Sequence, residues 1–166
     1  MNEGLVEMFR YNAWANLELF EACRSLTDDN LETRAPGGLA SVRELLVHIA
    51  GGQQTCVLRT QGRQHEGELG RWSDWPGIDA LIEIIKTTND ELISIAERLD
   101  DNEEVNLPYQ RKVFRFPKRF FLVQAIEHGV EHRTEVKLAL GNIGIATPDL
   151  DGWNYSAAAG YGQEVE

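Results

Sequence analysis

The stretch IDALIEIIKTTNDELISIAERL, residues 78–99, carries the clearest structural pattern in the chain. Its apolar residues recur at alternating steps of three and four, a spacing that places them on one face of an α-helix. All but one of the positions on this face are apolar: Ile78, Leu81, Ile85, Thr88, Leu92, Ile95 and Leu99. We therefore predict a helix that contributes to a hydrophobic core and takes no part in chemistry.

Three further segments show helical spacing, at about residues 3–25, 42–61 and 118–140. The second of them opens with a capping box, in which Ser41 is followed three residues later by Glu44. Four helices of about 20 residues, each about 30 Å long, are typical of a four-helix bundle. The predicted fold is therefore all-α, in a single domain over residues 1–166.

The links between the predicted helices are long enough to cross over the ends of a bundle, so a simple up-and-down order is not required. The link before the fourth helix changes from helical to alternating periodicity. Residues 105–107 and 113–116 both show this alternation, with Pro108 between them. We predict a small β-hairpin between the third and fourth helices, with its turn around Pro108.

Charge and composition argue against several classes of protein. The 166 residues include 27 acidic and 16 basic side chains, which gives a net charge of −11 at pH 7. Such a chain repels phosphate backbones, which argues against nucleic-acid binding. It contains no apolar run of the roughly 20 residues that a membrane span needs, and residues 1–14 lack the pattern of a signal peptide. We expect a soluble cytoplasmic protein whose two cysteines, Cys23 and Cys56, pack as small apolar residues.

Three of the four histidines fall on predicted inward helix faces. His128 and His132 are four residues apart, so both project from one side of the fourth helix, and His48 lies on the inward face of the second. Neutral imidazole is a good ligand for zinc, nickel, copper or iron, and three histidines leave one coordination position open, as catalytic sites do. The alternative is that each is an ordinary hydrogen-bonded core residue. His65 lies in a glycine-rich link, where we expect it to be solvated.

Several other polar residues are candidates for the same pocket, each with a plain structural alternative. Asn12 and Asn16 are one turn apart on an otherwise apolar face, so they either line a metal pocket or form helix–helix hydrogen bonds. Glu131 could act as a base or hold a ligand in place, but could equally be solvated beside Arg133 or Lys137. No residue is singled out as catalytic.

Basic residues gather at the predicted hairpin. Five of the 16 lie within nine positions: Arg111, Lys112, Arg115, Lys118 and Arg119. This cluster could receive an acidic substrate or a thiol cofactor, or could simply form a solvated face of the hairpin.

Four motifs resemble the DinB-like (DinB/YfiT) superfamily. They are YNAWAN at residues 11–16, HIA at 48–50, HGVEHR at 128–133 and the tail from Gly144 through PDLD at 148–151. Each is weak alone, but the ordered set covers nearly the whole chain. The resemblance implies a four-helix bundle with crossover links, often dimeric, and a divalent metal.

Carried over to this sequence, the three metal ligands of the superfamily are His48, His128 and His132. Relatives include transferases that use bacillithiol, mycothiol or glutathione, and a mycothiol-dependent maleylpyruvate isomerase. One departure is Glu135, because many relatives carry glutamine there. Its carboxylate adds negative charge near the site.

Taken together, these features predict a metal-dependent enzyme that acts on a small molecule, with zinc or nickel as the expected metal. The leading hypothesis is a transferase that uses a low-molecular-weight thiol, since coordination by a dication lowers the thiol pKa. The alternatives are a metal-dependent hydrolase and a non-catalytic, damage-inducible metal-binding protein. We also expect a homodimer, from the resemblance and from Trp72 and Trp75 in a link that must otherwise cover them.

Overall fold

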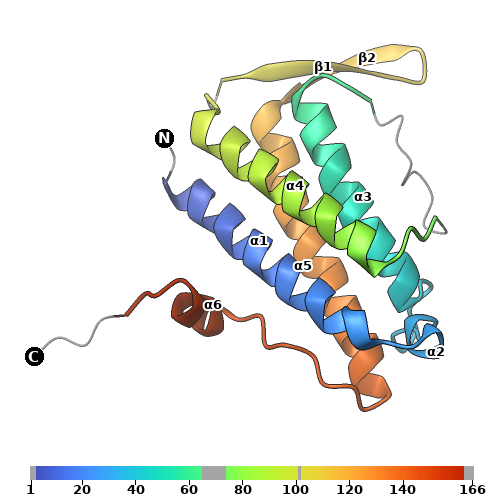
Figure 1. Cartoon of the computed structure of the whole chain (residues 1–166). Coiled ribbons are helices and arrows are strands. Elements are labelled where there is room, and N and C mark those ends of the chain that lie inside the picture. Colours follow the sequence, from blue (N-terminus) through green and yellow to red (C-terminus); the bar gives the residue numbers. More distant parts are fainter. Residues whose placement is uncertain (1–2, 65–73, 101, 163–166) are drawn as a thin grey trace, which may run out of the picture.

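All four predicted helices form in the computed structural model, which describes residues 3–64, 74–100 and 102–162. They are α1 (Glu3–Ala22), α3 (Val42–Thr60), α4 (Ile78–Arg98) and α5 (Lys118–Asn142), and they make up the four-helix bundle of Figure 1. The predicted all-α bundle is therefore confirmed, with helix ends within three residues of those expected.

Short helices fill the first link, where the hydrophobic pattern was too brief to reveal them. The chain leaves α1 through the 3₁₀ helix η1 (Cys23–Ser25) and enters α2 (Asp28–Leu31), which Thr27 caps. The predicted capping box then starts α3: the Ser41 hydroxyl accepts from the amide of Glu44 at 3.3 Å, and the Glu44 carboxylate accepts from the amide of Ser41 at 2.7 Å. A helix of only one turn has no amphipathic period, so sequence spacing does not predict it.

The order of the helices around the bundle differs from their order along the chain. The α1 helix packs against α4 and α5, and α3 packs against the same two helices. In Figure 1, α3 and α4 run in the same direction although they follow one another in sequence. Two consecutive helices that run in the same direction do not form an up-and-down pair, which confirms the predicted crossover topology.

The predicted hairpin is present, but its turn lies two residues later than expected. Strands β1 (Glu104–Tyr109) and β2 (Lys112–Pro117) pair antiparallel, with Tyr109 opposite Lys112. The turn residues Gln110 and Arg111 both have positive φ, the backbone conformation of tight two-residue hairpins. Pro108 lies inside β1 rather than in the turn, which a proline can do in a strand with an unpaired edge.

Two apolar clusters fill the bundle, and a layer of buried polar residues lies between them on all four helices. The cluster near α2 includes Leu19, Leu46, Ile82 and Val136, and the cluster near the hairpin includes Phe9, Val57, Leu92 and Phe121. We call the residues between them the polar layer: Asn12, Asn16, Gln53, Thr88, Asn89 and Arg133. Thr88, the one polar position in the pattern of residues 78–99, belongs to this layer.

The C-terminal segment folds back onto α1. It contains a short helix, α6 (Gly152–Ala158), which the sequence pattern did not predict. The Tyr11 hydroxyl donates to the carbonyl of Leu150 at 2.7 Å, and the ring of Tyr155 meets the rings of Tyr11 and Trp14 with centroids 5.6 Å away in each case. Within the described ranges, no helix combines the length and the apolar character that crossing a membrane would require.

Candidate metal centre

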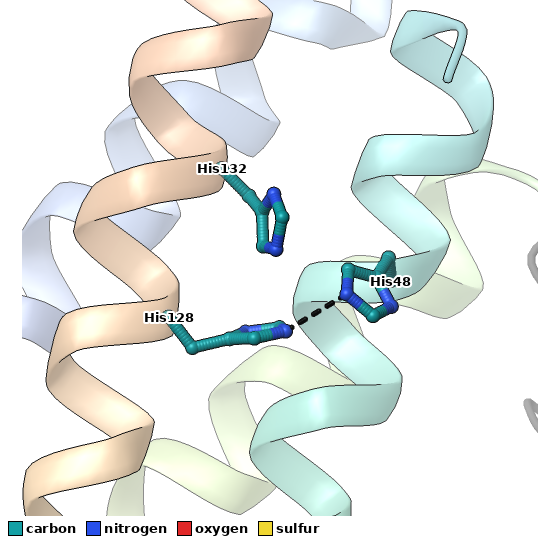
Figure 2. Close-up of side chains that lie close together, drawn as sticks. All are labelled: His48, His128 and His132. Carbon is teal, nitrogen blue, oxygen red and sulfur yellow. Dashed lines mark hydrogen bonds between the residues drawn. The ribbon is translucent and has the colours of Figure 1, made fainter. Parts of the chain in front are cut away.

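His48, His128 and His132 meet between α3 and α5, as the sequence spacing suggested. Figure 2 shows the three imidazoles pointing toward one another from the two helices. One nitrogen from each ring forms a set whose members all lie within 4.8 Å of one another, and Nε2 of His48 is 2.9 Å from Nε2 of His128. All three side chains are half-buried.

Two local features bring the rings together. His128 and His132 lie one turn apart on α5, so they share a face, and α3 packs along that face. Gly52, one turn after His48, makes room for the ring of His128. A Cβ atom at Gly52 would lie only 2.4 Å from Cε1 and 2.9 Å from Nδ1 of that ring, so a larger residue there would displace it.

The surroundings keep the imidazoles of His48 and His128 neutral. Burial, together with the neighbouring His128 and His132, lowers the pKa of His48 from 6.5 to about 4. Burial and His132 likewise lower the pKa of His128 to about 4. Both rings therefore carry a lone pair at neutral pH, the form in which histidine binds metals.

Glu135 holds the third ring in place. Its Oε2 atom lies 2.8 Å from Nδ1 of His132. A neutral imidazole that donates its Nδ1–H to this carboxylate keeps its lone pair on Nε2, an arrangement common among metal-binding histidines. The negative charge expected at this position is thus in direct contact with the histidine group.

These residues fit a divalent transition metal. Two imidazole nitrogens at about 2.05 Å from a tetrahedral zinc ion are about 3.3 Å apart, a spacing that the 4.8 Å spread of the three nitrogens reaches with small ring movements. Three neutral nitrogen donors leave one coordination position for an exogenous ligand. The group can therefore hold a metal and still present it to a small molecule.

Asn12 and Asn16 form the helix–helix hydrogen bonds that were their structural alternative. Their amide nitrogens donate to the Gln53 side-chain carbonyl at 3.4 and 2.8 Å. Their carbonyl oxygens accept from Nη1 of Arg133 at 2.7 and 2.6 Å. A role for either asparagine beside the metal stays a prediction.

Arg133 differs most from its expected place. Rather than lying in solvent beside Glu131, it is only 3% exposed, and its Nη1 atom donates to two neutral amides. Burial lowers the pKa of Arg133 to about 10, so the guanidinium remains charged at neutral pH. Gly129 makes room for it, since a Cβ there would lie 2.7 Å from Nη1 of Arg133 and 2.9 Å from Oδ1 of Asn12.

Gln53 connects Arg133 and its two asparagine partners to α4. The sequence pattern did not identify Gln53 as a polar core residue. Its amide nitrogen donates to Oγ1 of Thr88 at 2.8 Å and to Oδ1 of Asn89 at 2.7 Å. The polar layer could have been predicted from the asparagines on α1 and from Thr88 on α4, because each is a polar residue on an otherwise apolar helix face.

The remaining residues that the sequence analysis named do not join the histidine group in the described part of the chain. Glu131 is exposed, and it is Glu135 that contacts His132, so a catalytic or positioning role for Glu131 stays a prediction. Cys23 and Cys56 pack in the apolar clusters, as predicted, and burial raises the pKa of their thiols to about 12 and about 11. His65 and Trp72 lie outside the described residues.

Comparisons with known proteins agree with the fold. A DinB-like protein from Bacillus cereus shares the fold with a TM-score of 0.63 and 19% identity, over 89% of this chain and 96% of that one. YfiT from Bacillus subtilis, described as a probable metal-dependent hydrolase with an unusual four-helix bundle topology, has a TM-score of 0.63 and 15% identity, over 88% and 91% of the two chains. No curated protein sequence matches. The model of the DinB family matches residues 1–165, so the chain belongs to the DinB family.

Proposed function

We propose that this protein is a divalent-metal-dependent enzyme whose metal is held by His48, His128 and His132. The convergence of three imidazoles, two of them with a pKa near 4, is the observation that carries the proposal. Membership of the DinB family and the description of YfiT as a probable metal-dependent hydrolase support it. Zinc and nickel are the metals that we expect, since imidazole suits both.

The metal would supply one kind of chemistry: it would lower the pKa of a coordinated thiol or water and so provide a nucleophile at neutral pH. The chain's own residues prepare the site for this. Burial keeps His48 and His128 unprotonated, Gly52 leaves room for the ring of His128, and Glu135 fixes the orientation of His132.

The leading candidate activity is transfer of a low-molecular-weight thiol to an electrophilic small molecule, as in some relatives. The second is hydrolysis, which the description of YfiT favours. A metal-binding stress protein without turnover is the third. The three candidates differ in what the metal-loaded protein consumes: a thiol, an ester or neither. Assays of thiol consumption and of ester hydrolysis therefore separate them.

Metal content tests the site itself. We expect about one zinc or nickel ion per chain in the wild type, and a loss in each of His48→Ala, His128→Ala and His132→Ala. His65→Ala is the matched control, because it removes a histidine outside the group. Full metal retention by the His48→Ala and His128→Ala variants would refute the assignment.

Activity tests the proposed chemistry. The zinc- or nickel-loaded protein is incubated with a thiol panel (bacillithiol, mycothiol and glutathione) and a generic electrophile, and separately with activated esters. Thiol consumption that His128→Ala abolishes would support the transferase, and ester hydrolysis with the same dependence would support the hydrolase. Neither activity from a fully loaded protein would favour the non-catalytic metal binder.

We also propose a homodimer, which now rests on the family resemblance alone. Trp75 does not need a second copy to cover it, because the Arg43 guanidinium lies 5.0 Å from the centre of its ring and Trp75 also packs against the cluster near α2. Light scattering should report about twice the 18.7 kDa mass of one chain. A particle of 18.7 kDa at micromolar concentration would refute the dimer.

A further inference from the structure

A cavity lies at the hairpin end of the bundle, away from the histidines. Its volume is about 600 Å³, and strand β1, the hairpin phenylalanines and the nearby ends of α3 and α5 line it. Phe120, in its wall, precedes His128 by eight residues on α5, which is about 12 Å along the helix. The volume falls in the range of about 300–1,000 Å³ that is typical of small-molecule sites.

Phenylalanines make up half of the residues that line the cavity. Phe116 stacks on Phe120 with centroids 5.8 Å apart and an interplanar angle of 19°, and it meets Phe121 at 5.5 Å. Phe121 is buried, whereas Phe114 and Phe120 are 42% and 44% exposed. A wall of neighbouring phenylalanines that is partly open to water is the kind of apolar surface that marks a binding site.

One positive charge borders this apolar wall. Arg59, in the last turn of α3, lines the cavity and is exposed. No acidic side chain is among the described residues that line the cavity, and within that part of the chain Arg59 makes no ion pair. The nearby basic residues Arg115 and Lys118 are instead paired with Glu104 and Glu103.

We propose that this cavity binds a small organic anion with an apolar body. The body would pack against the phenylalanine rings, and a carboxylate or sulfonate would pair with the guanidinium of Arg59, whose planar fork matches such groups. Gln64, held at the cavity edge by donating to the carbonyl of Pro108, adds a polar neighbour for the same end of the ligand. The site is independent of the proposed metal enzyme and needs no metal.

Two fluorescent probes that differ in one charge test the proposal on the metal-free protein. One is 8-anilinonaphthalene-1-sulfonate, and the other is N-phenyl-1-naphthylamine, which has the same ring system without the sulfonate. We expect saturable binding of one sulfonate probe per chain, with Arg59→Met weakening it about five- to tenfold and leaving the neutral probe unchanged. Phe120→Ala should weaken both probes.

Lys137→Met is the matched control, because it removes the same charge about 25 Å farther along α5 than Phe120. It should leave both probes unaffected, and near-ultraviolet circular dichroism should show that each variant keeps its tertiary packing. Unchanged sulfonate binding in Arg59→Met, or unchanged binding of both probes in Phe120→Ala, would overturn the proposal. Since no metal is present, neither result bears on the histidine site.

Discussion

Neighbouring residues on α5 build two polar sites of opposite character. His128 and His132 face α3, where three half-buried imidazole rings converge. Gly129 and Arg133, each one residue further along, face α1, where a buried guanidinium bonds to two asparagine carbonyls. The first site gathers bases of one kind that can bind a cation together, and the second pairs amide groups and Nη1 of Arg133 with one another inside the chain.

The difference indicates which buried polar groups are evidence for a bound ligand. In the polar layer, Asn12, Asn16, Gln53 and Arg133 find partners on other helices, which suits a structural role. Around the histidines, three bases lie close together, and Nε2 of His48 is within hydrogen-bond distance of Nε2 of His128, at 2.9 Å. A cluster of bases is stabilised most by a metal, whereas a network of amides and a guanidinium needs none.

Removing a histidine is the sharpest test of whether the histidine site and the polar layer have different roles. His128→Ala should lower zinc affinity by more than about 100-fold, beyond the 10- to 100-fold effect typical of outer hydrogen-bond partners. The unfolding free energy of the metal-free protein should stay within about 1 kcal/mol of wild type, because the polar layer is intact. Isothermal titration calorimetry and urea denaturation measure the two effects. A large loss of metal-free stability would show that the histidines are part of the core.

The converse change is Arg133→Met. It should reduce the unfolding free energy by about 2–4 kcal/mol, since the carbonyls of Asn12 and Asn16 lose their donor inside the bundle. Zinc affinity of the folded variant should be unchanged, because Arg133 faces away from α3. Lys112→Met, on the exposed hairpin, is the control and should change stability by less than about 0.5 kcal/mol. Lost metal affinity in folded Arg133→Met would show that the two faces are coupled.

The two close-approach glycines allow the same comparison with a single methyl group. Gly129→Ala should cost about 1–3 kcal/mol of stability, because the methyl collides with Arg133. Gly52→Ala should instead displace the ring of His128 and lower zinc affinity about tenfold. Gly141→Ala, also on α5, has open space at its Cβ position and should be neutral or slightly stabilising. Equal effects of the first two changes on both measurements would contradict the division into two sites.

A subtler test replaces Glu135 by glutamine. The Glu135→Gln side chain can still accept from Nδ1 of His132, but it no longer carries the charge that strengthens that bond. We expect zinc affinity to fall about tenfold, at the low end of the range for such partners, with little change in stability. Glu127→Gln, an exposed glutamate of α5 with no proposed role, is the matched control and should leave zinc affinity unchanged. Equal losses in both variants would point to a general effect of charge.

The metal-free protein should also show a pH dependence that reports on the histidine site alone. His48 and His128 have a pKa of about 4 when folded and an ordinary value of 6.5 when unfolded. Between these values the unfolded chain binds more protons, so stability should fall as the pH drops from about 6.5 to about 4. The double variant His48→Gln with His128→Gln should show a shallower fall over that window in urea titrations. Identical slopes would mean that the histidines are not held neutral by the fold.

Local features of this protein could be predicted from the sequence because local spacing encodes them. The three–four rhythm of residues 78–99 specifies a helix whatever packs against it, and the pair Ser41 and Glu44 marks a helix start through contacts three residues apart. The spacing of His128 and His132 puts both on one face for the same reason. The alternation on both sides of the hairpin predicts its strands, although Pro108 misled the prediction of the turn.

The tertiary structure decided which of those faces meet. Asn16 and Arg133 are 117 residues apart, and no spacing rule says that their helices are neighbours. The cavity beside Arg59 likewise exists only once the hairpin covers the ends of two helices. Helix formation depends on contacts within a few residues, whereas partner choice depends on helix order, direction and rotation, which the packing of the whole bundle sets.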